Sequence, residues 1–267
     1  MQWAEVADIR IGYERAGEGP PLVLVHGAVS DSRVWEAQVE AFSDEFSVIA
    51  WDAPGCGQSA DPPESFRLPE YADALAGLLA QLALEPAHVL GHSFGGALAL
   101  ELAQRHPVAV QSLILVGGYA GWRGSLPRSE VDRRLSFALD VAGRLPGGFE
   151  PESMPGLFSE KMSPEAATTL RAIMADCRPV ATRAMAHALA EADLRDALPS
   201  IRVPTLLVYG DADERSSLSV AGDLNRRIPE SKLVVLPGLG HECYLEDPAL
   251  FNAEVRAFLA ITSRAQS

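Results

Sequence analysis

The chain has 267 residues, of which 48% are hydrophobic and 22% charged, as in a globular protein with one large domain or one domain with an insertion. Its formal net charge of −14 argues against a nucleic-acid backbone or an anionic membrane as a partner. The three scattered cysteines (Cys56, Cys177 and Cys243) predict neither a disulfide framework nor a zinc knuckle. Because the N-terminal residues lack an apolar signal core and no run approaches the ~20 apolar residues of a membrane span, we expect a cytoplasmic protein.

Short apolar runs predict a sheet that begins with antiparallel edge strands and continues as a parallel sheet. Residues 9–13 alternate between apolar and polar side chains, as a half-exposed edge strand does. Nearly continuous apolar runs, typical of strands covered on both faces, follow at 21–25, 46–51, 87–90, 112–116, 205–209 and 232–236. Helical patterns separate most of these runs, at 32–42, 68–84, 94–105, 218–228 and 248–261. The alternation predicts a doubly wound, mostly parallel α/β sheet with right-handed crossovers.

One connection departs from this alternation. Between the strands at 112–116 and 205–209 the chain has no strand-like run, and a structureless loop of that length is implausible in a compact domain. Helical patterns occur there near 130–144, 164–176 and 180–192. We therefore expect a helical cap at 119–199, inserted into a core formed by residues 1–118 and 200–267.

The expected cap is rich in large apolar side chains. It contains every methionine after Met1 and several aromatic residues, namely Met154, Met162, Met174, Met185, Tyr119, Trp122, Phe137, Phe149 and Phe158. Such residues either pack the interior of a cap or line an adaptable apolar roof over a ligand. Our candidates for a substrate pocket are Tyr119, Trp122, Met154 and Met162, together with Tyr244 from outside the cap, and they indicate a small-molecule substrate that is at least partly apolar.

The stretch Gly91-His92-Ser93-Phe94-Gly95-Gly96 joins the apolar strand at 87–90 to an alanine-rich helix. A strand that turns sharply into a helix exposes the middle residue above the sheet edge, and glycines two positions before and after it leave room for the crossing backbones. A merely small residue at a tight turn would not need both glycines. The pattern is typical of a nucleophile elbow with Ser93 as the nucleophile.

Polar residues also follow two later strands at the same edge of the sheet, where open parallel sheets bind their ligands. Asp211 and Asp213 follow the strand at 205–209, and His241 follows the strand at 232–236. A serine, an acid and a histidine in this chain order fit a catalytic triad, in which the imidazole takes the serine proton and the acid orients the imidazole. Asp211 competes with Asp213 for the place of the acid.

In their order, these motifs resemble those of the α/β-hydrolase family, in its capped single-domain branch, over essentially the whole chain. The matching pieces are His26-Gly27, Asp52-x-x-Gly55-x-Gly57-x-Ser59, the elbow, Gly210-x-x-Asp213, and Gly240-His241 followed by Leu245-Glu246-Asp247-Pro248. The resemblance implies Ser93 as nucleophile, Asp213 as acid and His241 as base. It also implies an oxyanion hole formed by the backbone amides of Ala28 and Phe94, and no metal or cofactor. Relatives with an aspartate at the elbow, such as haloalkane dehalogenases and epoxide hydrolases, do not fit.

Other polar residues near the motifs receive structural interpretations. We expect His26 and His92 to pack within their loops, Asp52 and Ser59 to brace the loop that contains them, and the thiols to be bystanders even where Cys56 and Cys243 approach the site. His88, His106 and His187 are interpreted as surface or helix-end residues. Arg123 is a weak candidate for meeting a substrate carboxylate, and the sequence shows no pair of cationic cap residues that demands an acidic substrate.

These expectations combine into a cofactor-independent serine hydrolase that cleaves carboxylic esters, or related acyl substrates such as lactones, through an acyl-enzyme. Alternatives with the same triad are a carbon–carbon bond hydrolase, a thioesterase and a cofactor-free perhydrolase. An alternative of another class is a small-molecule receptor built on this fold. The sequence leaves the choice among these activities and the oligomeric state open.

Overall fold

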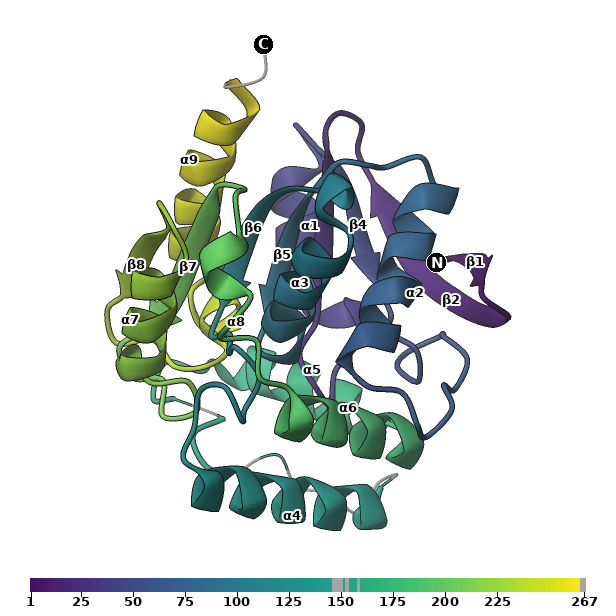
Figure 1. Cartoon of the computed structure of the whole chain (residues 1–267), viewed down its shortest axis with the longest axis vertical. Coiled ribbons are helices and arrows are strands. Elements are labelled where there is room, and N and C mark those ends of the chain that lie inside the picture. Colours follow the sequence, from purple (N-terminus) through teal and green to yellow (C-terminus); the bar gives the residue numbers. More distant parts are fainter. Residues whose placement is uncertain (146–150, 152–153, 158, 265–267) are drawn as a thin grey trace.

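The computed structural model describes residues 1–145, 151, 154–157 and 159–264, which form an α/β structure around an eight-stranded sheet (Figure 1). The strand order is β1-β2-β4-β3-β5-β6-β7-β8. The edge strands β1 (Gln2–Val6) and β2 (Ile9–Ala16) are antiparallel, and β2 also pairs antiparallel with β4. The parallel strands are β3 (Pro21–Val25), β4 (Ser47–Trp51), β5 (Ala87–His92), β6 (Val110–Val116), β7 (Thr205–Gly210) and β8 (Lys232–Leu236). The predicted mostly parallel sheet with antiparallel edge strands is confirmed.

Alternate side chains of the central strands enter two apolar cores, one on each face of the sheet. In β3, Val23 and Val25 belong to one core, whereas Leu22 and Leu24 belong to the other. Helices that pack on the first face are α2 (Leu68–Gln81), α3 (Phe94–Arg105) and α7 (Leu218–Arg227). Helices that pack on the second face are α1 (Glu36–Phe42) and α9 (Pro248–Arg264). Because both faces are buried, the central parallel strands need apolar residues at most positions, as their sequences predict.

Several helix boundaries differ from the predicted ones. The helical pattern at 32–42 divides into a 3₁₀ turn, Ser32–Trp35, and α1. The pattern at 68–84 ends as α2 at Gln81, and Ala83 has a φ of 55°, which no right-handed helix accommodates. The short helix α8 (Cys243–Glu246) was not predicted. The predicted start of α9 is confirmed, since Asp247 Oδ1 accepts a hydrogen bond of 3.0 Å from the backbone N–H of Leu250.

His88 is not a surface residue, and the prediction that placed it there is wrong. It lies in β5, between β3 and β6, and is fully buried because helices cover both faces of the sheet. Its Nδ1 lies 2.7 Å from Ser112 Oγ. Burial lowers the pKa of His88 to about 4, so the imidazole is neutral in the folded protein.

The helices α4 (Arg128–Arg144), α5 (Pro164–Ala175) and α6 (Pro179–Glu191) connect β6 to β7 and lie together beyond one end of the sheet (Figure 1). α4 packs against α6. The described residues of this connection contain no strand, whereas Phe149 and Phe158 lie outside the described residues. The division into a core and a cap at 119–199 stays a prediction. No helix formed by the described residues is long and apolar enough to cross a membrane.

Candidate active site

Ser93 occupies a strained turn between β5 and α3, with a φ of 51° and a ψ of −107°. A positive φ is uncommon for a residue other than glycine and marks a backbone conformation held in place by its surroundings. A Cβ on Gly91 would lie 2.2 Å from the carbonyl oxygen of Gly95, and a Cβ on Gly95 would lie 2.2 Å from that of Val25. The two glycines are therefore required by the close approach of the backbones, which is the local geometry that the elbow motif predicts.

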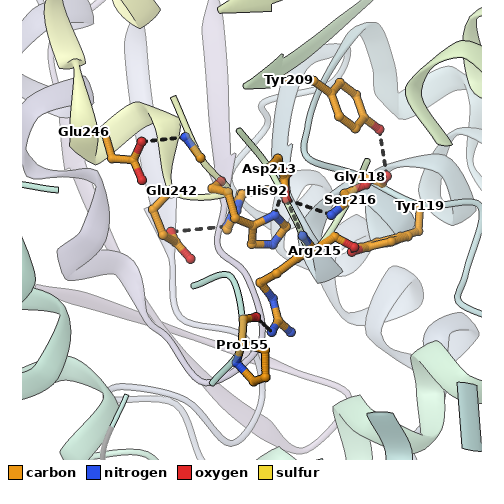
Figure 2. A network of polar contacts seen from close by, with 12 residues as sticks. His92, Gly118, Tyr119, Pro155, Tyr209, Asp213, Arg215, Ser216, Glu242 and Glu246 are labelled. Carbon is orange, nitrogen blue, oxygen red and sulfur yellow. Dashed lines mark hydrogen bonds and ion pairs between the residues drawn. The ribbon is translucent and has the colours of Figure 1, made fainter. Parts of the chain in front are cut away.

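His241 and Asp213 form a buried pair at the ends of β8 and β7, with 2.9 Å between His241 Nδ1 and Asp213 Oδ2. The other carboxylate oxygen, Oδ1, accepts hydrogen bonds from the backbone N–H groups of Arg215 (2.8 Å) and Ser216 (2.7 Å), as Figure 2 shows. Burial by itself raises the pKa of Asp213, but the attraction of His241 and these hydrogen bonds bring it below its usual value. The ionised carboxylate accepts a hydrogen bond from the Nδ1–H group of His241, so the proton of the neutral imidazole is held on Nδ1 and Nε2 keeps a free lone pair.

The neighbouring Asp211 makes a different contact. It is exposed, and its Oδ1 accepts a hydrogen bond of 2.6 Å from the backbone N–H of Gly238. Asp211 thus joins the loop after β7 to the loop after β8, whereas Asp213 contacts His241. This placement favours Asp213 over Asp211 as the acid of a triad.

Ser93 and His241 line one cavity, to which Ala28 also contributes. Most of the wall is apolar and includes Val29, Phe137, Val141, Leu157, Leu170 and Met174. Of the pocket candidates, Trp122, Met154 and Tyr244 line the cavity, whereas Tyr119 and Met162 are not among its described lining residues. Tyr119 is instead buried beside the cavity, where its hydroxyl donates to the carbonyl of Arg215.

The two amides expected to form an oxyanion hole are placed near Ser93. Phe94 is the first residue of α3, and Ala28 follows the end of β3. Among the described residues, neither backbone N–H donates a hydrogen bond to a protein group. Free N–H groups at a helix N-terminus favour negative charge, as a developing oxyanion requires.

His92 and Glu242 lie close to each other (Figure 2), and His92 also contacts His241. His92 Nε2 donates to the carbonyl of His241 at 3.1 Å, and its Nδ1 lies 3.9 Å from Glu242 Oε2. Burial lowers the pKa of His92 and raises the pKa of Glu242, which favours the neutral form of both. Within the described part of the chain, His92, His241 and Glu242 could hold a metal ion, since their ligand atoms lie within 4.8 Å of one another. Such an ion would engage the imidazole that a triad needs as its base.

The residues given structural interpretations make the corresponding contacts. His26 Nδ1 donates to the carbonyl of Gly27 (2.7 Å), and its Nε2 accepts from the N–H of Ala53 (3.0 Å). Asp52 accepts from the backbone N–H groups of Ser32 and Gln58, and Ser59 Oγ donates to the carbonyl of Asp52. These contacts brace the loops after β3 and β4.

The other residues considered in the sequence lie away from the cavity. The thiols of Cys56, Cys177 and Cys243 are buried, and burial raises the pKa of each. Arg123 is exposed outside the cavity. His106 and His187 are half-exposed at the end of α3 and on α6.

The sequence analysis missed the three cationic residues of the cavity wall, namely Arg133, Arg134 and Arg215. The first two lie on α4, in an arginine-rich chain where no pattern singles them out. Arg215 could have been found, because a residue two positions after the candidate acid Asp213 must lie close to the site.

A serine on a strained strand-to-helix turn and a buried histidine–carboxylate pair thus meet at one cavity beside a doubly wound sheet. A doubly wound sheet with a sharp strand-to-helix turn of this kind defines the class of α/β proteins that carry a nucleophile elbow. The chain belongs to the alpha/beta hydrolase family, whose family model matches residues 22–254.

Individual relatives match nearly the whole chain. A pimeloyl-[acyl-carrier protein] methyl ester esterase of Aeromonas hydrophila is 32% identical and covers 93% of this chain and 99% of the relative. A thermophilic esterase from Thermogutta terrifontis is 30% identical, with a TM-score of 0.89, and covers 98% of this chain and 99% of that structure. The enol-lactonase from Burkholderia xenovorans is 25% identical, with a TM-score of 0.80, and covers 97% of this chain and 100% of that structure.

Proposed function

We propose that this protein hydrolyses carboxylic esters, including lactones, through a Ser93–His241–Asp213 triad and an acyl-enzyme. The observation that carries the proposal is the 2.9 Å contact between His241 and Asp213 at the cavity that Ser93 also lines. The similar proteins named as esterases support an ester substrate, and the enol-lactonase supports the inclusion of lactones.

In the proposed reaction, Ser93 Oγ attacks the substrate carbonyl carbon while His241 Nε2 accepts the hydroxyl proton. Asp213 stabilises the imidazolium that forms. The negative charge on the former carbonyl oxygen is stabilised by the amides of Ala28 and Phe94, and such a donor contributes about 3 kcal/mol to lowering the barrier. His241 then protonates the leaving alcohol, and afterwards takes a proton from the water that releases the acid. The apolar wall excludes bulk water from the first step.

The test is active-site labelling combined with turnover. A fluorophosphonate probe should add its mass to the peptide that contains Ser93, and short p-nitrophenyl esters should be hydrolysed. Ser93→Ala should abolish labelling and lower kcat/KM by roughly 10⁶-fold with the fold intact. Ser219→Ala, on the exposed side of α7, is the matched control and should behave as the wild type. Ester hydrolysis that persists in Ser93→Ala would refute the proposal.

A panel of esters, lactones and thioesters separates the proposed activity from the alternatives. Preference for thioesters would indicate a thioesterase. Labelling of Ser93 without turnover of any acyl substrate would indicate a small-molecule receptor on this fold.

A further inference from the structure

Arg215 is a cationic residue of the cavity wall that the proposed reaction does not use. It lies in the loop between β7 and α7, where its backbone N–H holds Asp213, and its side chain extends away from the acid toward Pro155 (Figure 2). The guanidinium donates one hydrogen bond, of 3.1 Å, from Nη1 to the Pro155 carbonyl. Since a guanidinium has five N–H donors, most of its capacity is unused by the described residues.

The charge of Arg215 has no partner at contact distance in the part of the chain that the structure describes. Among residues 1–145, 151, 154–157 and 159–264, no carboxylate forms an ion pair with it. The other two arginines of the cavity wall differ in this respect. Arg133 and Arg134 share the carboxylate of Glu130, at 2.7 and 2.6 Å. Arg215 is therefore the cavity arginine whose charge the described residues leave uncompensated.

Arg215 is half-buried, so its guanidinium loses part of its hydration, and the described residues replace little of it. Burial lowers the pKa of Arg215 through desolvation, and the nearby charge of Arg134 acts in the same direction. Glu242 and Asp213 attract it, but Asp213 is paired with His241. The pKa of Glu242 is raised by burial, which reduces its negative charge. A guanidinium stays protonated in proteins, so an anion beside it would supply the missing compensation.

We infer that Arg215 binds a carboxylate of the substrate, and that the cavity takes acyl substrates with a second, anionic end, such as half-esters of dicarboxylic acids. This inference deepens the proposed function and rests on it. The planar fork of a guanidinium matches the two oxygens of a carboxylate. Between the two ends, a methylene chain would contact the apolar wall formed by residues such as Val141, Leu170 and Met174.

The first arm of the test compares two substrates that differ only in charge, mono-p-nitrophenyl adipate and its methyl ester. The ratio of kcat/KM for the acid over the methyl ester should fall about 10- to 100-fold in Arg215→Met, the range expected for a charged hydrogen-bonding partner. Arg215→Lys should retain part of the ratio because it keeps the charge. Arg123→Met removes an exposed arginine outside the cavity and should leave the ratio at the wild-type value.

The second arm measures binding without turnover. Monomethyl adipate is titrated into Ser93→Ala, and into the same variant carrying Arg215→Met, by calorimetry. The inference expects the Kd to rise about 10- to 100-fold when Arg215 is replaced. Both variants keep the backbone N–H that holds Asp213.

The two arms separate the two proposals. If the neutral ester is hydrolysed but neither the ratio nor the Kd depends on Arg215, the carboxylate subsite is refuted and the serine hydrolase stands. If no ester is hydrolysed but the Kd depends on Arg215, the subsite stands and the proposed activity is refuted.

Discussion

Asp213→Asn should disable the imidazole of His241 by forcing the wrong tautomer. Asp213 Oδ1 accepts from two backbone N–H groups, those of Arg215 and Ser216. In the variant the amide oxygen must take this position, because an amide NH₂ there would face two donors. The NH₂ group then points at His241 Nδ1 and donates to it. The imidazole proton then lies on Nε2, which in the proposed triad faces the Ser93 hydroxyl and has no lone pair left to accept its proton.

The expected loss in kcat/KM is about 10⁴-fold, which corresponds to about 5 kcal/mol of transition-state stabilisation. The assay is hydrolysis of a p-nitrophenyl ester, with thermal unfolding followed in parallel to show that the fold is kept. Asp211→Asn is the matched control, since its amide oxygen can still accept from Gly238 and should leave kcat/KM within about threefold of the wild type. The reasoning is refuted if Asp213→Asn retains activity within tenfold, or if Asp211→Asn loses as much.

Two further predictions concern stability. Gly95→Ala should lower the free energy of unfolding by about 3 kcal/mol, because its Cβ would lie 2.2 Å from the Val25 carbonyl oxygen. A Cβ added by Gly143→Ala in α4 would have no atom within 4 Å, so this variant should raise the free energy of unfolding by up to ~1 kcal/mol. Equal effects of the two substitutions in urea titrations would contradict the steric argument. The pKa of His88 is lowered from 6.5 to about 4, so between these pH values the unfolded chain binds a proton that the folded protein does not, and stability falls as the pH decreases. The free energy of unfolding is lowered by up to about 3 kcal/mol at pH 4 through this proton. His88→Asn should therefore reduce the proton uptake on unfolding between pH 6.5 and 4 by about one proton, and an unchanged slope of stability against pH would contradict this assignment.

The strands and the elbow were predictable because strong local constraints determine them. Strands buried on both faces need continuous apolar runs, and the predicted ends of the buried strand β3 match the structure. The predicted ends of β8 match as well, although this strand lies at the edge of the sheet and is partly exposed. Gly91 is required by its close approach to Gly95 within the turn, and Gly95 by its close approach to Val25 at the end of the neighbouring strand β3.

The choice between Asp211 and Asp213 could not come from residue spacing alone. Both residues lie in the loop after β7, and what separates them is the path of the backbone, which directs one carboxylate to His241 and the other to Gly238. His88 was misplaced although its position inside a run buried on both faces carried the necessary signal. The position of Arg215 two residues after Asp213 places it near the site, but only the three-dimensional arrangement shows that no described carboxylate pairs with it.

Position 215 combines two tasks that belong to different parts of one residue. The main-chain N–H donates to Asp213, while the side chain lines the cavity. Every amino acid except proline supplies that N–H. Replacements at this position can therefore change which molecules the cavity accepts and still keep this contact to Asp213. Substitutions of this one residue could therefore give rise to new substrate preferences in descendants of this protein while the backbone hydrogen bond to Asp213 is kept.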